Sequence, residues 1–202
     1  WINPRGRVYP TTLGITCSNI TFVGTGKDKT TILGGFSVYN QKNITFTQMT
    51  VINTTDSCSG ISIENAQVEL MDVVFNNCSH AGLIIPHSSS SETTVVAKRC
   101  KFANSEYGAV LRRLRSSPLS FSAKFSNCLF QGNTYDGIRV SGKATIHLHG
   151  EATKIDTNGN NGIFAQVHAK VIIHLPSHHN TLYNNGRDRK TETGGTITNV
   201  ED

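Results

Sequence analysis

Short segments in which apolar and polar residues alternate dominate the chain. Such alternation turns every second side chain to the same face of a β-strand. The segments Asn19–Phe22 and Asn43–Phe46 share the sequence Asn-Ile-Thr-Phe and start 24 residues apart. Looser copies keep this phase, with apolar residues heading the predicted strands at Ile20, Ile44, Val68, Val95 and Ala123 and again two residues later at Phe22, Phe46, Leu70, Ala97 and Phe125. The pattern predicts a repeat of short strands.

Each repeat carries three further markers. A second apolar series runs through Val51, Phe75, Phe102, Phe130, Ile155 and Leu182. Asparagines follow it by two or three residues, at Asn53, Asn77, Asn104, Asn133, Asn158 and Asn185. A Gly-apolar step then closes each unit, at Gly60-Ile61, Gly82-Leu83, Gly108-Ala109, Gly137-Ile138 and Gly162-Ile163.

Units of roughly 22–29 residues have room for three short strands and three turns, which is one coil of a parallel β-helix. Stacked coils place like on like: apolar residues fill the core, asparagines bond the backbone of a bend, and glycines allow close approach or a positive φ. We therefore predict an all-β, right-handed parallel β-helix of about seven coils, as a single domain over residues 1–202. Because the chain begins at Trp1, we expect a truncated or processed N-terminus.

The composition agrees with such a narrow core. Hydrophobic residues make up 37% and charged residues 16% of the 202 residues, both below the usual globular share. No stretch approaches the roughly 20 apolar residues of a membrane span, so membrane insertion is not expected. Amphipathic helices are also missing, and we interpret Arg112–Ser120 and His87–Glu92 as loop excursions from the coil.

The net charge of +5 is concentrated in the second half of the chain, most densely at Arg112, Arg113 and Arg115. Nucleic-acid binders show a stronger basic stripe, so a solvated loop is the better interpretation. Of the five cysteines, Cys100 and Cys128 are in phase with the core and are predicted to be buried thiols. No cysteine pair has metal-ligand spacing.

The segment Ile20–Gly34 is similar to the N-terminal coils of pectin methylesterases. The repeat over residues 43–185 resembles the right-handed β-helix, pectate-lyase-like superfamily, and the stretch from His174 to Val200 resembles uncharacterised β-helix proteins of algae and other microbial eukaryotes. This superfamily contains polysaccharide lyases, esterases, hydrolases and epimerases as well as virion proteins and non-catalytic scaffolds, so the resemblance implies a fold more than a chemistry. Of the polygalacturonase motifs, Asn53–Asp56 is one residue too long and the others are absent, which favours a non-catalytic role.

The corner before the Gly-apolar strand holds the first candidate site. There Glu106-Tyr107-Gly108 aligns with Tyr135-Asp136-Gly137, and Arg139 aligns with an exposed Phe164 on the following strand. Glu106 and Asp136, with Arg139, suit a retaining glycosidase, whose carboxylates lie about 5–5.5 Å apart; they can equally share a Ca²⁺. Alternatively, Tyr107, Tyr135, Arg139 and Phe164 form a sugar-binding groove without chemistry, or all are ordinary turn residues.

Histidine forms the second candidate, because six of the eight His lie in the last 56 residues. With Ile146 and Leu148 inward, His147 and His149 point outward, and His174 is expected over His147. Such a ladder can bind a divalent metal or act as a general base, or it is a polar strand face. We expect His147, His149 and His174 to contact ligand, place His178-His179 in a turn, and assign no metal or cofactor apart from the Ca²⁺ considered above.

These observations lead to a non-catalytic recognition or scaffold module whose flat side binds glycans or protein partners. A polysaccharide-active lyase, hydrolase or epimerase using Glu106, Asp136 and Arg139 is the first alternative. A structural component of a virion or cell surface is the second, and an extracellular, cell-surface or virion-associated location is favoured. Because the ends of a β-helix are open sheet edges, end-to-end or side-by-side self-association is also expected.

Overall fold

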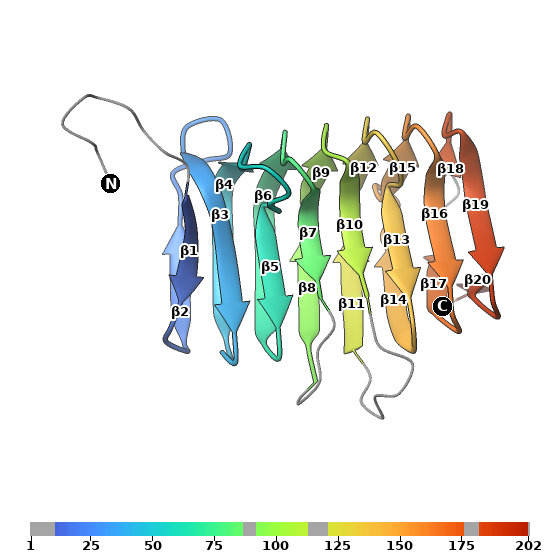
Figure 1. Ribbon diagram of the computed structural model, residues 1–202, viewed down its shortest axis with the longest axis horizontal. Helices are drawn as coiled ribbons and strands as arrows, with labels where there is room; N and C mark the ends of the chain where they lie inside the picture. The colour runs from blue at the N-terminus through green and yellow to red at the C-terminus, as the bar shows by residue number, and fades with distance from the viewer. Residues whose placement is uncertain (1–10, 87–91, 113–120, 176–181, 202) are drawn as a thin grey trace.

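The chain winds into a right-handed parallel β-helix of about seven coils, as expected. The structure is a computed structural model that describes residues 11–86, 92–112, 121–175 and 182–201. Figure 1 shows the coils side by side along the long axis, with the first strands at one end and the last at the other. The predicted excursions at Arg112–Ser120 and His87–Glu92 fall largely outside the described residues, as do Trp1, Arg113, Arg115, His178 and His179.

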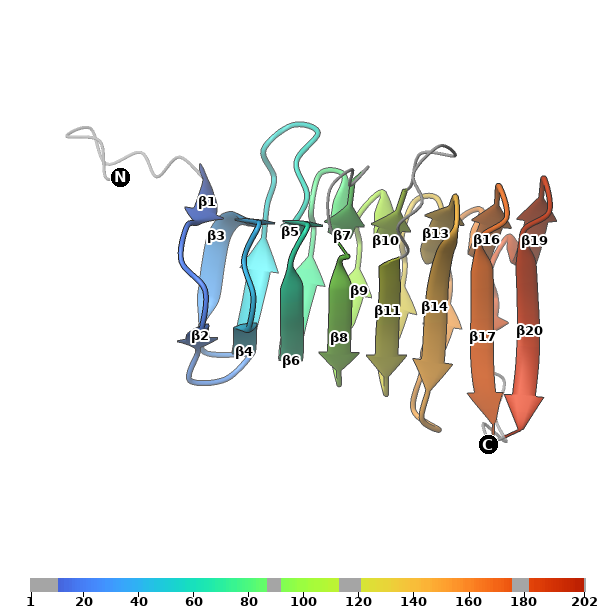
Figure 2. The same cartoon turned by 90° about the horizontal axis from the view of Figure 1, so that it is seen from below.

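The strands of successive coils form three parallel sheets. Sheet 1 contains β1 (Thr11–Ile15), the second part of β3 (Thr31–Tyr39), β5 (Ile61–Glu64), β7 (Ala81–Ile85), β10 (Tyr107–Leu111), β13 (Ile138–Ser141), β16 (Asn161–Gln166) and β19 (Arg187–Glu192). Sheet 2, which faces the viewer in Figure 2, contains β2 (Ile20–Val23), the first parts of β4 (Ile44–Ile52) and β6 (Gln67–Asn76), β8 (Thr94–Lys98), β11 (Phe121–Ser126), β14 (Ala144–His149), β17 (Lys170–Leu175) and β20 (Thr196–Glu201).

Sheet 3 is the shortest and contains the first part of β3, the second parts of β4 and β6, β9 (Lys101–Ala103), β12 (Leu129–Gln131), β15 (Lys154–Asp156) and β18 (Leu182–Tyr183). Sheets 2 and 3 meet at a bend whose residues have left-handed φ angles of 53–58°: Gln48, Asp72, Arg99 and Asn127. Arg99 bonds both carboxylate oxygens of Asp72 across this bend, at 2.8 and 2.6 Å.

Three sheets enclose a narrow interior filled by apolar ladders, and sheet 2 alone contributes two, one through Ile44 and Val68 and one through Phe46 and Leu70. The register pairs Phe75 with Phe102 and Phe102 with Phe130, as the repeat predicts. Their rings stack nearly parallel, with centroids 5.3 and 4.9 Å apart. Cys100 and Cys128 are buried free thiols beside them, also as predicted. Within the described residues no helix has the length and apolar character needed to cross a membrane.

The predicted asparagine ladder is wrong in one respect: it combines residues from two neighbouring positions of the coil, one exposed and one facing inward. Asn77 and Asn104 are exposed, with left-handed φ angles of 51° and 53°. The inward ladder is one residue later and consists of Asn53, Cys78, Ser105, Asn133, Asn158 and Asn185. In its last three coils the amides bond each other directly, at 2.8 Å per step. The distance from the apolar marker does not separate the two positions, because Asn53 follows Val51 by two residues, as Asn77 follows Phe75, and is nevertheless buried.

The glycine ladder is confirmed, and close approach rather than a positive φ explains it. A Cβ added at Gly108 would lie 2.5 Å from the carbonyl oxygen of Gly137 in the next coil. At Gly137 it would lie 2.8 Å from Ile155 and from the carbonyl oxygen of Gly162. The corner is thus so tight that the coils touch backbone to backbone immediately before each strand of sheet 1.

Candidate functional site

The outer face of sheet 1 carries a row of cationic and aromatic side chains on its last three strands. The register pairs Arg139 of β13 with Phe164 of β16, and Phe164 with Lys190 of β19. The guanidinium carbon of Arg139 lies 5.0 Å from the centroid of the Phe164 ring, and Nζ of Lys190 lies 4.7 Å from it. The two cations cover the ring, so Phe164 is only 5% exposed. The exposed phenylalanine expected from the sequence is therefore wrong.

Three aromatic side chains extend this row toward the N-terminal coils. Nη1 of Arg139 donates to Oη of Tyr107 at 3.3 Å. The Tyr107 ring lies 5.2 Å from that of Tyr135 and 5.5 Å from that of His80, measured between centroids. Tyr135 is the most open of them, at 39% exposure. We call these residues the sheet 1 row: His80, Tyr107, Tyr135, Arg139, Phe164 and Lys190.

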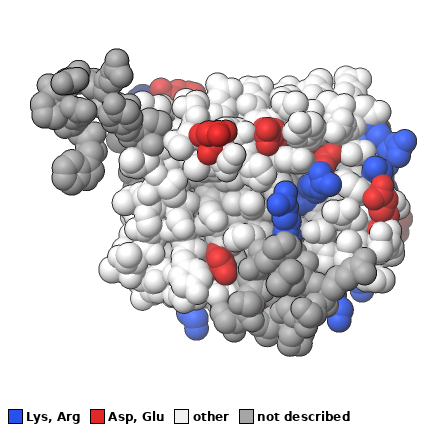
Figure 3. All heavy atoms as spheres, in the orientation of Figure 1, with Lys and Arg blue, Asp and Glu red and all other residues white. Residues whose placement is uncertain are grey.

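Two members of the row were missed from the sequence. His80 aligns with Glu106 of the next coil, since Ala81 pairs with Tyr107, so an extended alignment would have found it. Lys190 lies in the segment Arg187–Glu192, whose residues carry no apolar alternation. Figure 3 shows Lys and Arg gathering over β10 to β19 on this face.

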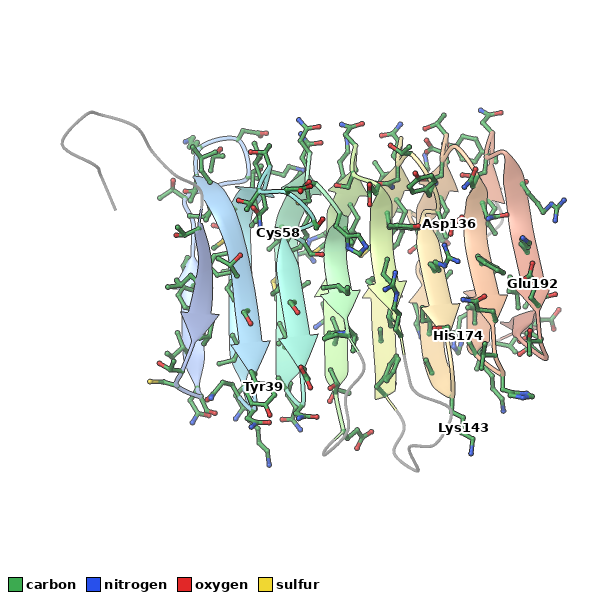
Figure 4. The ribbon with its side chains drawn as sticks, in the orientation of Figure 1. Tyr39, Cys58, Asp136, Lys143, His174 and Glu192 are labelled. Carbon is green, nitrogen blue, oxygen red and sulfur yellow. The ribbon has the colours of Figure 1, made fainter. Side chains whose placement is uncertain are left out.

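Asp136 lies under this face rather than on it. Its Oδ1 accepts from the backbone N–H of Asn161 at 3.1 Å and from Nδ2 of Asn161 at 2.6 Å. Its Oδ2 is 3.7 Å from Nη1 of Arg139. Asp136 is 1% exposed, at the end of sheet 1 where the chain enters β13 (Figure 4).

This placement differs from the pair of accessible carboxylates expected from the sequence. The register sets Glu106 beside Tyr135, and Glu106 is half-buried while Asp136 is buried. The reason is local to this coil: Asp136 turns inward before Gly137 and bonds the backbone N–H of Asn161 in the next coil, whereas the aligned Tyr107, before Gly108, bonds Arg139 on the outer face. Asp136 thus holds the corner together and faces one side of Arg139.

A shallow, polar depression of about 440 Å³ continues the row at the C-terminal end. It is lined by Gly159, Asn160, Asn161, Gly186, Arg187 and Lys190. Lys190 joins it to the row, and this cation is also paired with Glu192 at 2.8 Å. Arg187 pairs with Asn161 in the sheet register and is exposed. The depression therefore offers amides and two cations to a polar ligand.

The histidines form a second group, on the outer face of sheet 2. His147 and His149 come from β14 and His174 from β17, and the register that pairs Leu148 with Ile173 places His174 beside His149. The expected pairing of His174 with His147 is wrong by two residues. It was based on the spacing between Ile155 and Leu182 in sheet 3, and paired residues of β14 and β17 in sheet 2 are closer together in sequence than that. Nδ1 of His147 nevertheless lies 3.0 Å from Nε2 of His174. Burial first, then His174 and Lys124, lower the pKa of His147.

No protein-family model matches the sequence, and no curated protein is significantly similar to it. Among solved structures, endopolygalacturonase I from Stereum purpureum, complexed with two galacturonate, superposes with a TM-score of 0.54 at 16% identity. The chain has the right-handed parallel β-helix fold. The match covers 92% of this chain but only 61% of the fungal enzyme. At this identity the likeness of the two β-helices concerns the fold alone.

On this β-helix, the sheet 1 row is suited to binding anionic, ring-shaped groups. Guanidinium and ammonium groups bind carboxylates, and aromatic rings supply apolar faces beside them. The Ca²⁺ site considered for Glu106 and Asp136 gains no support from this geometry, because both oxygens of Asp136 already face donors of Asn161 and Arg139.

Proposed function

We propose that this protein is a recognition module that binds an acidic polysaccharide along the outer face of sheet 1. The observation that carries the proposal is the fixed position of Arg139, between Tyr107, Phe164 and the buried carboxylate of Asp136. A guanidinium held in this way loses little further side-chain entropy on binding and is planar, like the carboxylate it would contact. The galacturonate bound to the fungal endopolygalacturonase is itself an acidic sugar, which supports this ligand class.

The spacing of the row favours a linear polymer over a single sugar. Successive coils are about 4.8 Å apart, so Arg139 and Lys190, which are two coils apart, are separated by about 10 Å along the helix axis. Arg187 extends the same direction into the polar depression. A polysaccharide lying along the helix axis would contact one outward side chain per coil, and such an arrangement suits a ligand that is held by repeated weak contacts. A ligand of this kind also fits the extracellular or cell-surface location expected from the sequence.

The test compares affinity for polygalacturonate with affinity for neutral dextran, by calorimetry or affinity electrophoresis. We expect binding to polygalacturonate only, weakened by added salt because exposed charges are screened over about 8–10 Å. Arg139→Gln should weaken binding about tenfold, the effect of losing one charge-assisted contact. Lys154→Gln, which removes an exposed cation from sheet 3, is the matched control and should leave the affinity unchanged. Equal affinity for both polymers, or equal loss in both variants, would refute the proposal.

The enzymatic alternative is tested on the same samples by measuring reducing ends and unsaturated products. It depends on Glu106 and Asp136, and the burial of Asp136 argues against it. If product does form, Glu106→Gln and Asp136→Asn should abolish it; product that survives both changes excludes these residues. A scaffold role, in a virion or at a cell surface, instead predicts a mass that rises with protein concentration in light scattering.

A further inference from the structure

The three histidines of sheet 2 lie outside the proposed glycan-binding face, on a different side of the β-helix. His147 and His149 alternate outward along β14, and His174 projects outward from the neighbouring β17 (labelled in Figure 4). All three are half-buried. One ring nitrogen from each of them lies within 4.8 Å of the others. Three imidazoles converging in this way are a common ligand set for transition metals.

We propose that His147, His149 and His174 form a binding site for a first-row divalent transition metal, with Zn²⁺, Ni²⁺ and Cu²⁺ as the ions it accepts. Imidazole nitrogen suits these ions, whereas Mg²⁺ and Ca²⁺ require oxygen ligands. Three protein ligands leave at least one coordination position for water or a ligand from solvent. The site does not depend on the proposed binding of polysaccharide.

The distances agree with such a site after small side-chain movements. Zn–N bonds of about 2.0–2.1 Å in a tetrahedron place the nitrogens about 3.3 Å apart. Nδ1 of His147 and Nε2 of His174 are already 3.0 Å apart. His149 stacks on His174 with ring centroids 3.8 Å apart and planes 15° apart, so one of these two rings must rotate to direct its lone pair at the ion. The χ2 torsion of histidine has a broad energy profile, so such a rotation costs little.

The contact between His147 and His174 can convert from a hydrogen bond to a shared ion without loss of a proton. In the hydrogen bond, one of the two facing nitrogens carries the hydrogen. When that ring adopts its other tautomer, the hydrogen moves to its second ring nitrogen and both facing nitrogens become lone-pair donors. The ion then occupies the space that the hydrogen bond bridged. The bound ion would join β14 to β17 and so hold two adjacent coils together.

The experiment is isothermal titration of the full chain with ZnCl2, NiCl2 and CuSO4 in a non-chelating buffer at pH 7.5. We expect one ion per chain, tightest for Cu²⁺ by the usual order of divalent affinities, and no binding of Mg²⁺ or Ca²⁺. Saturating Zn²⁺ should raise the thermal midpoint by about 5 °C, since the three histidines converge only in the folded chain. X-ray absorption of the Zn²⁺ form should give three nitrogens at about 2.0–2.1 Å.

Single replacement of His147, His149 or His174 by Ala should each lower the affinity about tenfold or more. These side chains face outward, so far-UV circular dichroism should stay unchanged in all three variants. His168→Asn is the matched control, because His168 is exposed with a φ of 64°, an angle that Asn adopts readily. The proposal is overturned if no ion binds at millimolar concentration, or if the affinity survives these three changes; its loss in the double variant His178→Ala, His179→Ala would overturn it as well, by placing the ion elsewhere.

Discussion

Replacing Asn158 by Ala tests whether the inward asparagine ladder holds the coils together. Asn158 is 1% exposed and occupies the middle of the direct amide ladder. Its Nδ2 donates to the carbonyl of Phe130 at 3.2 Å and to Oδ1 of Asn185 at 2.8 Å. Its Oδ1 accepts from the backbone N–H of Asn133 at 3.2 Å and from Nδ2 of Asn133 at 2.8 Å.

The cost of this replacement follows from the groups that lose their partners. The amide of Asn133 keeps its bond to Phe102, and Oδ1 of Asn185 keeps the backbone N–H of residue 158. The N–H of Asn133 and the carbonyl of Phe130 lose the bonds that the Asn158 side chain made. The Phe130 carbonyl stays in the backbone ladder between β12 and β15, so the N–H of Asn133 is the group left without a partner. An unsatisfied buried polar group costs about 1–3 kcal/mol, so we expect a loss of about 1–3 kcal/mol in the free energy of unfolding.

Urea unfolding followed by far-UV circular dichroism measures this loss as a lower midpoint. Asn104→Gly is the matched control: Asn104 is the exposed asparagine of the neighbouring ladder, and its left-handed φ of 53° suits glycine. Its one side-chain bond reaches the half-buried Asn76 at the surface, so we expect a change below about 1 kcal/mol. If Asn158→Ala proves as mild as Asn104→Gly, the inward ladder does not stabilise the corner and the reasoning is wrong.

Two further predictions concern the corner and the sheet 1 row. Gly108→Ala forces a Cβ to 2.5 Å from the Gly137 carbonyl oxygen and should cost about 1–3 kcal/mol, whereas Gly14→Ala, with nothing within 4 Å, should be mild in the same urea assay. Burial, followed by the charge of Arg112, lowers the pKa of His80, so its NMR titration should have a midpoint below 6.5. Because the folded state disfavours the charged ring, the contribution of His80 to stability is complete above pH 6.5 and declines as the pH falls further. A midpoint at or above 6.5 would contradict the half-buried position of His80 beside Arg112.

The sequence predicted which residues of the candidate site lie in neighbouring coils better than it predicted which of them face outward. Arg139, Tyr107 and Tyr135 were identified because the Gly-apolar step fixes the phase of sheet 1, and the register confirms that phase. Whether a side chain at a corner faces inward was not predictable, because it depends on backbone angles that no apolar pattern reports. Asp136 shows this: it precedes the glycine, and the turn directs it to the N–H of Asn161.

The sequence by itself determined the fold, because period-two alternation repeated over many coils allows one arrangement in which Phe75, Phe102 and Phe130 stack. The tertiary structure alone decided the neighbours across coils. Coil length varies, so a single offset cannot align all three sheets, and His174 pairs with His149 instead of His147. The tertiary structure also decided that β19 is a strand: its residues show no apolar alternation, and it is extended because it pairs with β16. Both outcomes arise from hydrogen bonds between coils, and these form only when distant segments meet.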